Sequence, residues 1–355
     1  MSKTLIDILR IMAIVVGLFV LSVLAFLAFL TLTEFSPALK SSPVIKGKGQ
    51  PMDAAKREFT MLSWNIGYGG LGKEMDFFYD GGRLVMPRKN QFDRYFDGIK
   101  KEILAHDTAD FILLQEVDVQ SKRSWNYDEF AALSGLLPGF FNMFAQNYGS
   151  FYIPFPFNDP IGRVKAGLAC YSKLKAASSE THYFPSDRSW PKRLAFLRRC
   201  FVILRFQLDN GRELVILNTH NSAYDPAGVW RKQEMSLLDS VMRHEYQLGN
   251  YVVAGGDWNS NPRGFNGDLV DSGDPVFRIE PSVEPGFLPG WQFVYDPQLP
   301  SNRNVDMAYR KGITKTTIID FFVVSPNVGV LKVKTMSLGF ADSDHNPVMM
   351  GIRLK

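Results

Sequence analysis

An acid and an amide stand two residues apart where an apolar run ends in the middle of the chain. The segment 250–254 is apolar and bounded by turn residues, which predicts a buried strand, and two glycines then precede Asp257 and Asn259. Side chains at positions i and i+2 of an extended segment point to the same side, so both groups would face one site. Such a pair can handle a proton or a metal and hold a phosphate oxygen. An ordinary polar turn has the same local sequence, so the rest of the chain must decide.

Polar residues recur at the ends of, or within, other apolar segments. A carboxylate in an apolar strand is costly unless it is paired or binds a metal. Taken one at a time, each residue has an ordinary explanation, such as a strand end facing water or a hydrogen-bonded structural histidine. Taken together they indicate one site, because the chain has only five histidines and two of them belong to this set. The further members are Asn65, Glu116, His220, Asp320, Asp344 and His345.

These residue types suit metal-assisted attack of water on a phosphate ester. Carboxylates are the ligands that a hard cation such as Mg²⁺ prefers, and Mn²⁺ is the alternative. The metal would neutralise the phosphate oxygens and the leaving oxygen. Histidine and amide groups would hold the phosphoryl group while a carboxylate activates water.

The elements that position these groups are mostly strands, which run in groups with few helices between them. This order favours two packed sheets flanked by helices in one domain over a parallel barrel. The loop 67–88 is too long for a simple connection, so we expect it to be functional. Strands are predicted at 59–66, 109–117, 166–171, 196–207, 213–217, 250–254, 316–324, 330–336 and 348–354, and helices at 91–106 and 227–246.

The N-terminal part of the chain differs from the rest. Residues 11–32 are uncharged and almost wholly apolar, long enough to cross a bilayer and longer than the core of a signal peptide, so after a flank at 1–10 we predict an uncleaved anchor. Residues 33–58 read as a flexible tether, and 59–355 as the catalytic domain. Positive charges lie on both sides of the anchor, and we expect an extracytoplasmic domain. The small net charge of +4 does not by itself call for nucleic acid.

The two cysteines leave two readings open. Cys170 and Cys200 lie in apolar strand-like runs, and no metal-binding spacing surrounds them. They are either two buried thiols or, if the domain lies outside the cytoplasm, one disulfide between neighbouring strands.

Six short motifs in order along the chain resemble the endonuclease/exonuclease/phosphatase superfamily, the fold of deoxyribonuclease I and of the neutral sphingomyelinases. The resemblance covers the chain from Phe59 to its end and implies a four-layer α/β sandwich with a divalent metal. The motifs are Ser63-Trp64-Asn65, Leu114-Gln115-Glu116, Asn218-Thr219-His220, Gly256-Asp257-Trp258-Asn259, Ile319-Asp320-Phe321 and Ser343-Asp344-His345.

The resemblance also implies a role for each motif residue. Glu116 would be the main metal ligand, with Asn65 and Asp344 nearby. Asp257 would activate water and Asn259 would contact the phosphate. The remaining three roles are phosphate contact by His220 and His345, and orientation of His345 by Asp320.

The substrate is less specified than the chemistry. The inositol polyphosphate 5-phosphatase branch is disfavoured, because its pattern has arginine at the position of Ser260, directly after Asn259. The apurinic nuclease branch is also disfavoured, because it usually has tyrosine at the position of His220. The anchor favours the sphingomyelinase-like branch and a lipid head group. So do apolar and aromatic residues in 67–88 and 151–157, unless these pack under their own loops. A basic cluster could meet phosphates of lipid or nucleic acid, or be a solvated edge: Lys192, Arg193, Arg198 and Arg199.

Three hypotheses therefore stand. The first is a membrane-anchored, divalent-metal-dependent phosphodiesterase or phosphatase acting on a phospholipid-type substrate. The second is an anchored nuclease that cleaves DNA or RNA. The third is a lipid-remodelling accessory or binding protein whose hydrolysis is incidental.

Overall fold

Alternation of side chains along two neighbouring strands explains how the core is built. β3 (Glu58–Asn65) and β4 (Phe111–Asp118) are parallel and almost fully buried. Met61 and Leu113 point into the core between the two sheets, whereas Leu62 and Leu114 point the other way, into the core beneath the helices. Each strand therefore has two apolar faces, as a sheet covered on both sides requires.

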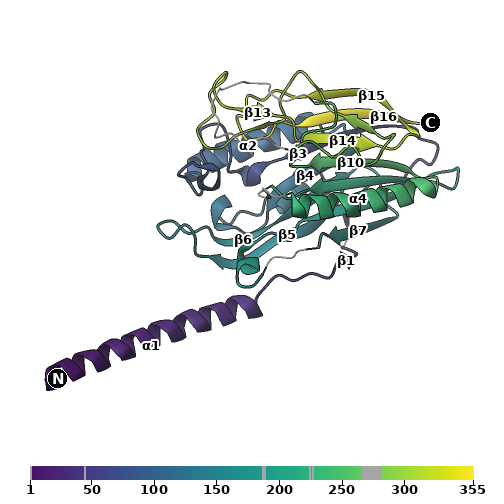
Figure 1. Cartoon of the computed structure of the whole chain (residues 1–355). Helices are drawn as coiled ribbons and strands as arrows, with labels where there is room; N and C mark the ends of the chain where they lie inside the picture. The colour runs from purple at the N-terminus through teal and green to yellow at the C-terminus, as the bar shows by residue number, and fades with distance from the viewer. Residues whose placement is uncertain (1, 44, 186–188, 224, 226–227, 266–280) are drawn as a thin grey trace.

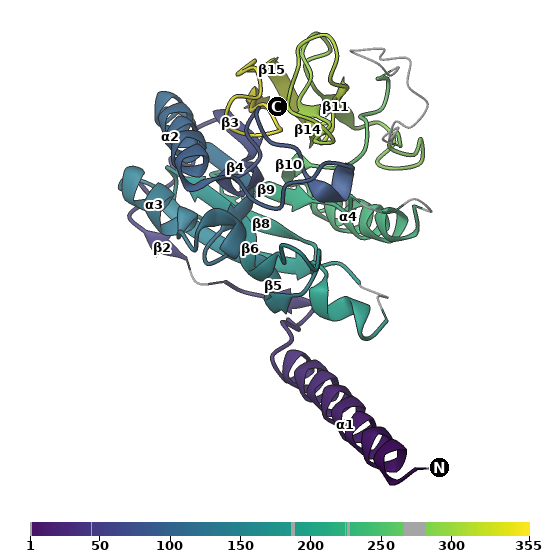
Figure 2. The same cartoon turned by 90° about the vertical axis from the view of Figure 1, so that its left-hand side faces the viewer.

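The computed structural model describes residues 2–43, 45–185, 189–223, 225, 228–265 and 281–355. Two seven-stranded sheets pack face to face, with strand orders β15-β16-β3-β4-β6-β5-β2 and β1-β7-β8-β9-β10-β14-β11 (Figures 1 and 2). Helices α2 (Lys89–Ala105) and α3 (Glu129–Leu136) cover the outer face of the first sheet, and α4 (Val229–Gln247) covers that of the second. The predicted four-layer α/β sandwich is confirmed.

The remaining elements complete these layers. A small pair, β12 and β13, lies beside the larger sheets. The strands are β1 (Lys40–Ser41), β2 (Lys46–Gly47), β5 (Phe141–Ile153), β6 (Gly162–Ser172), β7 (Ser178–Tyr183), β8 (Cys200–Gln207), β9 (Glu213–His220), β10 (Tyr251–Asp257), β11 (Gln292–Val294), β12 (Asn302–Arg303), β13 (Thr316–Thr317), β14 (Asp320–Val324), β15 (Val328–Thr335) and β16 (Val348–Leu354), and the 3-10 turns are η1 (Gly67–Gly69), η2 (Phe78–Asp80), η3 (Lys122–Ser124) and η4 (Lys192–Ala195).

Several elements differ from the sequence prediction. The strand expected at 196–207 begins only at Cys200, because the residues before it follow the turn η4, and the strand expected at 316–324 is split into β13 and β14. The prediction missed the short strands β1, β2, β11 and β12 and the longer elements β5, β7 and α3. β5 carries Asn142, Gln146 and Asn147 within its run, and two register shifts interrupt its pairing with β6, so no regular alternation marks it. α3 has eight residues, too few for a clear helical period.

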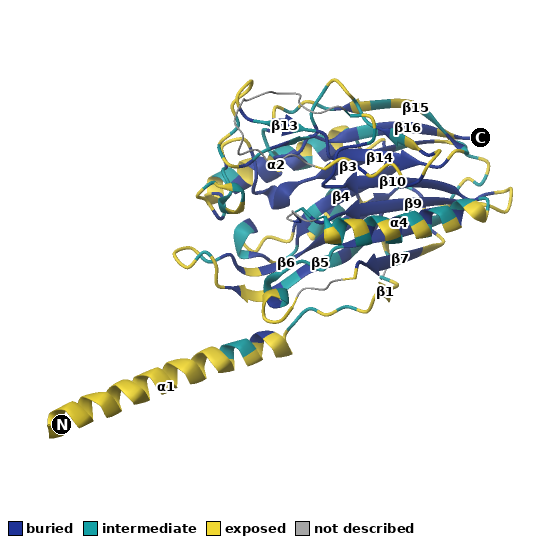
Figure 3. Ribbon diagram, in the orientation of Figure 1, coloured by how far each residue is buried: buried dark blue, intermediate teal, exposed yellow. Residues whose placement is uncertain are grey.

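Helix α1 (Lys3–Leu32) is longer than the predicted anchor. It begins after Ser2, whose side chain accepts a hydrogen bond from the backbone N–H of Leu5. Leu30 is its only buried residue, and Figure 3 shows the rest of the helix exposed along nearly its whole length. The helix is long and apolar enough to cross a membrane, a test that a signal sequence also passes.

The segment predicted to be a flexible tether carries structure of its own. β1 pairs with β7 at the edge of one sheet, and β2 pairs with β5 at the edge of the other. The backbone N–H of Tyr183 also donates to the carbonyl of Leu39 at 2.9 Å. The outer strands of both sheets have unpaired backbone groups, and this segment satisfies part of them, which composition could not reveal.

Both cysteines are free thiols. Cys170 in β6 and Cys200 in β8 are buried in the core between the sheets. Burial raises the pKa of Cys170 to about 12, so its thiol stays protonated at neutral pH. The sequence allowed either two buried thiols or a disulfide, and in the structure the two cysteines are buried thiols.

Candidate active site

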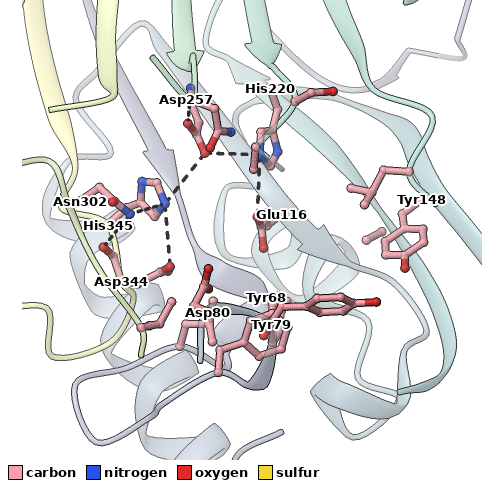
Figure 4. A pocket seen from close by; sticks show the side chains of 18 of the residues that line it. Tyr68, Tyr79, Asp80, Glu116, Tyr148, His220, Asp257, Asn302, Asp344 and His345 are labelled. Carbon is pink, nitrogen blue, oxygen red and sulfur yellow. Dashed lines mark hydrogen bonds and ion pairs between the residues drawn. The ribbon is translucent and has the colours of Figure 1, made fainter. Parts of the chain in front are cut away.

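The strand register brings the predicted polar residues to one edge of the sandwich. β9 and β10 are parallel, so His220 and Asp257 stand opposite each other at their carboxyl ends. β14 runs antiparallel to β10, which places Asp320 at its first residue opposite Asp257 on the other side. Asn65 ends β3 in the facing sheet. Residues far apart in the chain thus meet because strand ends of both sheets share this edge (Figure 4).

The glycine before Asp257 is required by the close approach of two strands. Gly256 has φ of 150°, and a Cβ atom there would lie 2.0 Å from the carbonyl oxygen of Thr219. The carboxylate that follows accepts two hydrogen bonds, and the imidazole of His220 lies beside it. Its Oδ2 lies 3.0 Å from Asn65 Nδ2 and 3.3 Å from His220 Nε2, and its Oδ1 accepts from the backbone N–H of Asn259 at 3.0 Å. Asp257 is therefore oriented as an acceptor at the centre of the site.

Glu116 is presented to the site by a break in strand β4. The register of β4 with β6 shifts between Leu114 and Val117, and Glu116 there has φ of 54°, a left-handed conformation that is unfavourable for a residue with a Cβ. Its Oε1 lies 3.4 Å from Asn65 Nδ2 and 3.8 Å from His220 Nε2. Its side chain is about a quarter exposed while its neighbours are buried, so it faces the opening of the site.

Asp320 holds the imidazole of His345. Its Oδ2 lies 2.7 Å from His345 Nδ1 and accepts from Ser301 Oγ, also at 2.7 Å. On the other side of the ring, Nε2 lies 3.9 Å from carboxylate oxygens of Asp257 and Asp344. Burial alone would lower the pKa of His345, but the three carboxylates outweigh it and raise this pKa to about 10. His345 is therefore a fixed cation.

The second histidine has the opposite character. Burial lowers the pKa of His220 well below its usual range, and the positive charge of Arg199 adds to the effect. Its Nδ1 atom is buried and has no hydrogen-bond partner among the described residues. The site thus holds one neutral and one charged imidazole.

The carboxylates of Glu116 and Asp344 suit a divalent cation. Burial raises the pKa of Asp344 to about 7, and the charge of Glu116 contributes to this rise. Such repulsion between close carboxylates is relieved when a cation binds between them. Asn65, predicted as a further ligand, lies beside these groups: its Oδ1 accepts from the backbone N–H of Gly67, and its Nδ2 lies 3.4 Å from Glu116 Oε1 and 3.0 Å from Asp257 Oδ2.

A second set of donor atoms also lies close together. Ligand atoms of Asp257, Asp320 and His345 lie within 4.8 Å of one another. In this set, Oδ2 of Asp320 accepts the hydrogen bonds of His345 and Ser301, whereas its Oδ1 is buried and has no partner among the described residues. The described residues thus offer two candidate positions for a cation, one at Glu116 and Asp344 and one at Asp257, Asp320 and His345.

The site lies in a cavity of about 770 Å³ that is polar on one side and apolar on the other. Figure 4 shows Glu116, Asp257, Asp344 and both histidines converging, with Tyr68, Tyr79 and Tyr148 lining the cavity around them. The apolar side comes from the 67–88 loop, the end of the β5–β6 hairpin and the segment after η4. Its members are Leu71, Phe77, Val85, Ile161, Ala195 and Leu197.

The loop 67–88 is held by an arginine that the sequence analysis did not single out. Arg303 is buried and its guanidinium donates to the carbonyls of Leu71, Gly72 and Met75. The loop is therefore a fixed wall of the cavity. Of its apolar residues proposed for an interface, Met75 and Val85 are buried, whereas Tyr79 and Leu84 are exposed.

The basic cluster predicted near residue 195 divides into two parts. Arg193 and Arg198 form ion pairs with Glu34, at 3.2 and 2.5 Å. Arg199 instead lines the cavity, and its buried Nη1 has no hydrogen-bond partner among the described residues. No periodic pattern in the sequence distinguishes Arg199 from its neighbours. Another lining residue, Asn302, was missed entirely; its side-chain amide lies 3.0 Å from His345 Nε2.

The chain is similar to known proteins both in its sequence family and in its fold. The model of the Endonuclease/Exonuclease/phosphatase family matches residues 62–345. No curated protein sequence matches the chain. Similar solved structures include an endonuclease/exonuclease/phosphatase from Beutenbergia cavernae DSM 12333, with 18% identity, coverage of 84% of this chain and 72% of that one, and a TM-score of 0.54.

Two further solved structures are similar over most of the chain. The human Nocturnin catalytic domain with bound sulfate has 16% identity, covers 88% of this chain with 98% of its own, and has a TM-score of 0.51. ANGEL2, described as a 2′,3′-cyclic phosphatase, in complex with adenosine-2′,3′-vanadate has 17% identity, coverage of 88% and 99%, and a TM-score of 0.55. At these identities the similarity concerns the fold.

Proposed function

Because the chain belongs to the endonuclease/exonuclease/phosphatase family, we propose that it is a membrane-anchored, divalent-metal-dependent phosphoesterase that acts on a lipid head group. The observation that carries the hydrolytic part is the convergence of Glu116, Asp257 and Asp344 with one neutral and one charged histidine in a single cavity. The lipid part rests on the apolar side of that cavity and on helix α1.

The protein groups divide the work of hydrolysis. Glu116 and Asp344 would hold Mg²⁺ or Mn²⁺, which when bound supplies charge neutralisation at the phosphate. Asp257 is the best-placed acceptor for the proton of an attacking water, because its neighbours fix both of its oxygens. Asn65 orients this carboxylate and that of Glu116.

The two histidines would act on the phosphoryl oxygens in different ways. His345, held charged by Asp320, stabilises negative charge as it develops on the phosphate. His220 is neutral and can donate one hydrogen bond without adding charge. Asn259 lies on the cavity wall, where its backbone is fixed by Asp257 and its side chain donates to the carbonyl of Asn221. We assign it to phosphate contact.

The substrate class follows from the shape and polarity of the cavity. A head group and its phosphate would lie against the carboxylates and histidines, and the first part of the acyl chains would lie on the apolar wall. The anchor would keep the site near a bilayer. We propose that the domain lies on the extracytoplasmic side, and that 59–355 forms the catalytic unit.

A nuclease acting on DNA or RNA is the second candidate, and one feature favours it. Three tyrosines, Tyr68, Tyr79 and Tyr148, line the cavity beside Arg199, and aromatic rings and a free guanidinium also suit a nucleotide. Binding of nucleic acid should weaken steeply as salt rises, whereas attack on a zwitterionic lipid should not.

The deciding experiment is a hydrolysis panel with the full chain in detergent and Mg²⁺ or Mn²⁺. The panel holds sphingomyelin, glycerophospholipids, DNA, RNA and bis-p-nitrophenyl phosphate, with Glu116→Ala and His345→Ala as blanks. Lipid turnover that disappears in both variants supports the proposal, and turnover of nucleic acid alone supports the second candidate. If the folded protein is inactive throughout, or the variants match the wild type, the phosphoesterase proposal is wrong and a binding or lipid-remodelling role takes its place.

A further inference from the structure

The last turns of helix α1 are packed against the catalytic domain. The rings of Phe29 and Phe151 meet edge to face with centroids 4.8 Å apart, and those of Phe26 and Tyr152 with centroids 6.0 Å apart. Leu30, which follows Phe29 in the helix, is buried. The apolar helix is therefore attached to the far end of β5 rather than joined to the domain only by its chain.

Polar contacts secure the same junction on the other side. The indole N–H of Trp190 donates to Thr31 Oγ1 at 3.0 Å. Glu34, directly after the helix, forms ion pairs with Arg193 and Arg198, at 3.2 and 2.5 Å, and its side chain is largely buried. Charged and polar groups thus begin where the apolar helix ends, as expected at the boundary between hydrocarbon and water.

An exposed aromatic surface surrounds this junction. We call it the aromatic rim and define it by Phe151, Tyr152, Phe155, Phe157 and Trp190. Phe157 is 84% exposed and Phe155 46%, which is unusual for side chains of this size in water. The rim combines Phe with the amphipathic rings of Tyr and Trp, the composition of a membrane interface belt.

The rim is continuous with the apolar wall of the active site. Phe155 contacts Phe78 with ring centroids 5.9 Å apart, and Phe78 contacts Tyr79 at 4.3 Å. Tyr79 lines the cavity, as does Ile161, which ends the same hairpin that carries Phe157. Ring contacts therefore lead from Phe155 through Phe78 to Tyr79, which lines the cavity of the catalytic groups (Figure 4).

We propose that the aromatic rim is a bilayer-docking surface that seats the domain on a phosphatidylcholine membrane with the cavity mouth facing the lipid. Helix α1 fixes the rim at the level of the head groups, because the ring contacts of Phe26 and Phe29 leave no room for a long spacer. A phospholipid molecule would then move along the path from Phe155 to Tyr79 without leaving the apolar phase. This last step rests on the proposed function, whereas the docking itself does not.

The docking is tested on the full chain in phosphatidylcholine nanodiscs. Phe157→Cys is labelled with an environment-sensitive fluorophore, and the two native cysteines are buried and do not interfere. Leu331→Cys, on the exposed side of β15, is the matched control. We expect doxyl-labelled lipid to quench the probe at 157 at least about fivefold more than the probe at 331, because quenching by a lipid-borne group requires contact with the bilayer. Equal quenching at both positions refutes the proposal, and so does a blue-shifted probe at 157 that lipid does not quench, which indicates a second copy of the chain.

A turnover assay separates this inference from the proposed function. Phe157→Ser should lower hydrolysis of bilayer lipid about tenfold and leave hydrolysis of bis-p-nitrophenyl phosphate unchanged, while Leu331→Ser changes neither. If the soluble diester is hydrolysed but Phe157→Ser turns over bilayer lipid normally, the docking surface is wrong and the phosphoesterase stands. If the wild type hydrolyses nothing while the probe at 157 is still quenched, the docking surface stands and the proposed function is wrong.

Discussion

Because the backbone at Glu116 is strained, we predict that without metal the Glu116→Gly variant is more stable than the Glu116→Ala variant. Both substitutions remove the carboxylate, and with it the repulsion from Asp344, so the difference between them isolates the backbone. A residue with a Cβ costs roughly 1–2 kcal/mol in the left-handed region, which glycine avoids, while the extra flexibility of glycine costs about 0.5–1 kcal/mol. Glu116→Gly should therefore be about 1 kcal/mol more stable than Glu116→Ala, or about 2 °C in Tm.

The assay is thermal and urea unfolding of the full chain in detergent with EDTA. Glu58→Gly and Glu58→Ala are the controls, because Glu58 is exposed on regular β3 and does not have positive φ. At that position glycine should be the less stable of the two. The same order at 116 as at 58 would show that Glu116 carries no backbone strain. In a second arm, Mg²⁺ or Mn²⁺ at about 100 times its Kd should stabilise the wild type by about 2.7 kcal/mol and neither Glu116 variant.

Three further outcomes are expected. Arg199→Ala should lower kcat/KM about 10- to 100-fold, because the substrate loses a charged hydrogen bond. Arg199→Lys should recover part of this kcat/KM, and an unchanged kcat/KM in Arg199→Ala would contradict a phosphate contact. Asp320→Asn should lower kcat by a similar factor with little change in Tm, because His345 loses the partner that orients it, and an effect on KM alone would contradict this role. Burial lowers the pKa of His182, so as pH falls below about 6.5 this histidine takes up a proton in the unfolded chain before it does so in the folded protein. The free energy of unfolding should therefore decline with falling pH, by up to about 1.4 kcal/mol per pH unit. Urea titrations should show a shallower decline for His182→Asn, but not for the exposed control His244→Asn.

Much of the fold was predictable because its signals are local. β3, β4, β10 and β16 are short apolar runs with polar ends, and α2 has a clear helical period, so the ends of each were placed to within three residues. β5 and β7 were not predicted, because polar residues interrupt their apolar pattern and pairing with neighbouring strands is what makes them strands. The edge strands β1 and β2 escaped for the same reason.

Most residues of the candidate site could be predicted from the sequence, because Asn65, Glu116, His220 and Asp257 end or interrupt apolar runs and His345 precedes the last one. Their roles as metal ligand, base or phosphate contact remain predictions that the experiments above test. How these groups influence one another depends on the packing of distant segments. A pKa depends on burial and on charges from other strands, so one imidazole is held neutral and another charged.

The sequence likewise showed an apolar N-terminal helix and scattered aromatic residues, but not that they belong together. Phe29 and Phe151 are far apart in the chain and meet because β5 ends beside the last turn of α1. In the same way, Arg199 differs from Arg193 and Arg198 only in what lies opposite: an open cavity for the first, and Glu34 for the other two. Residue type and strand period are properties of the local sequence, whereas contacts between distant segments arise only when the two sheets pack.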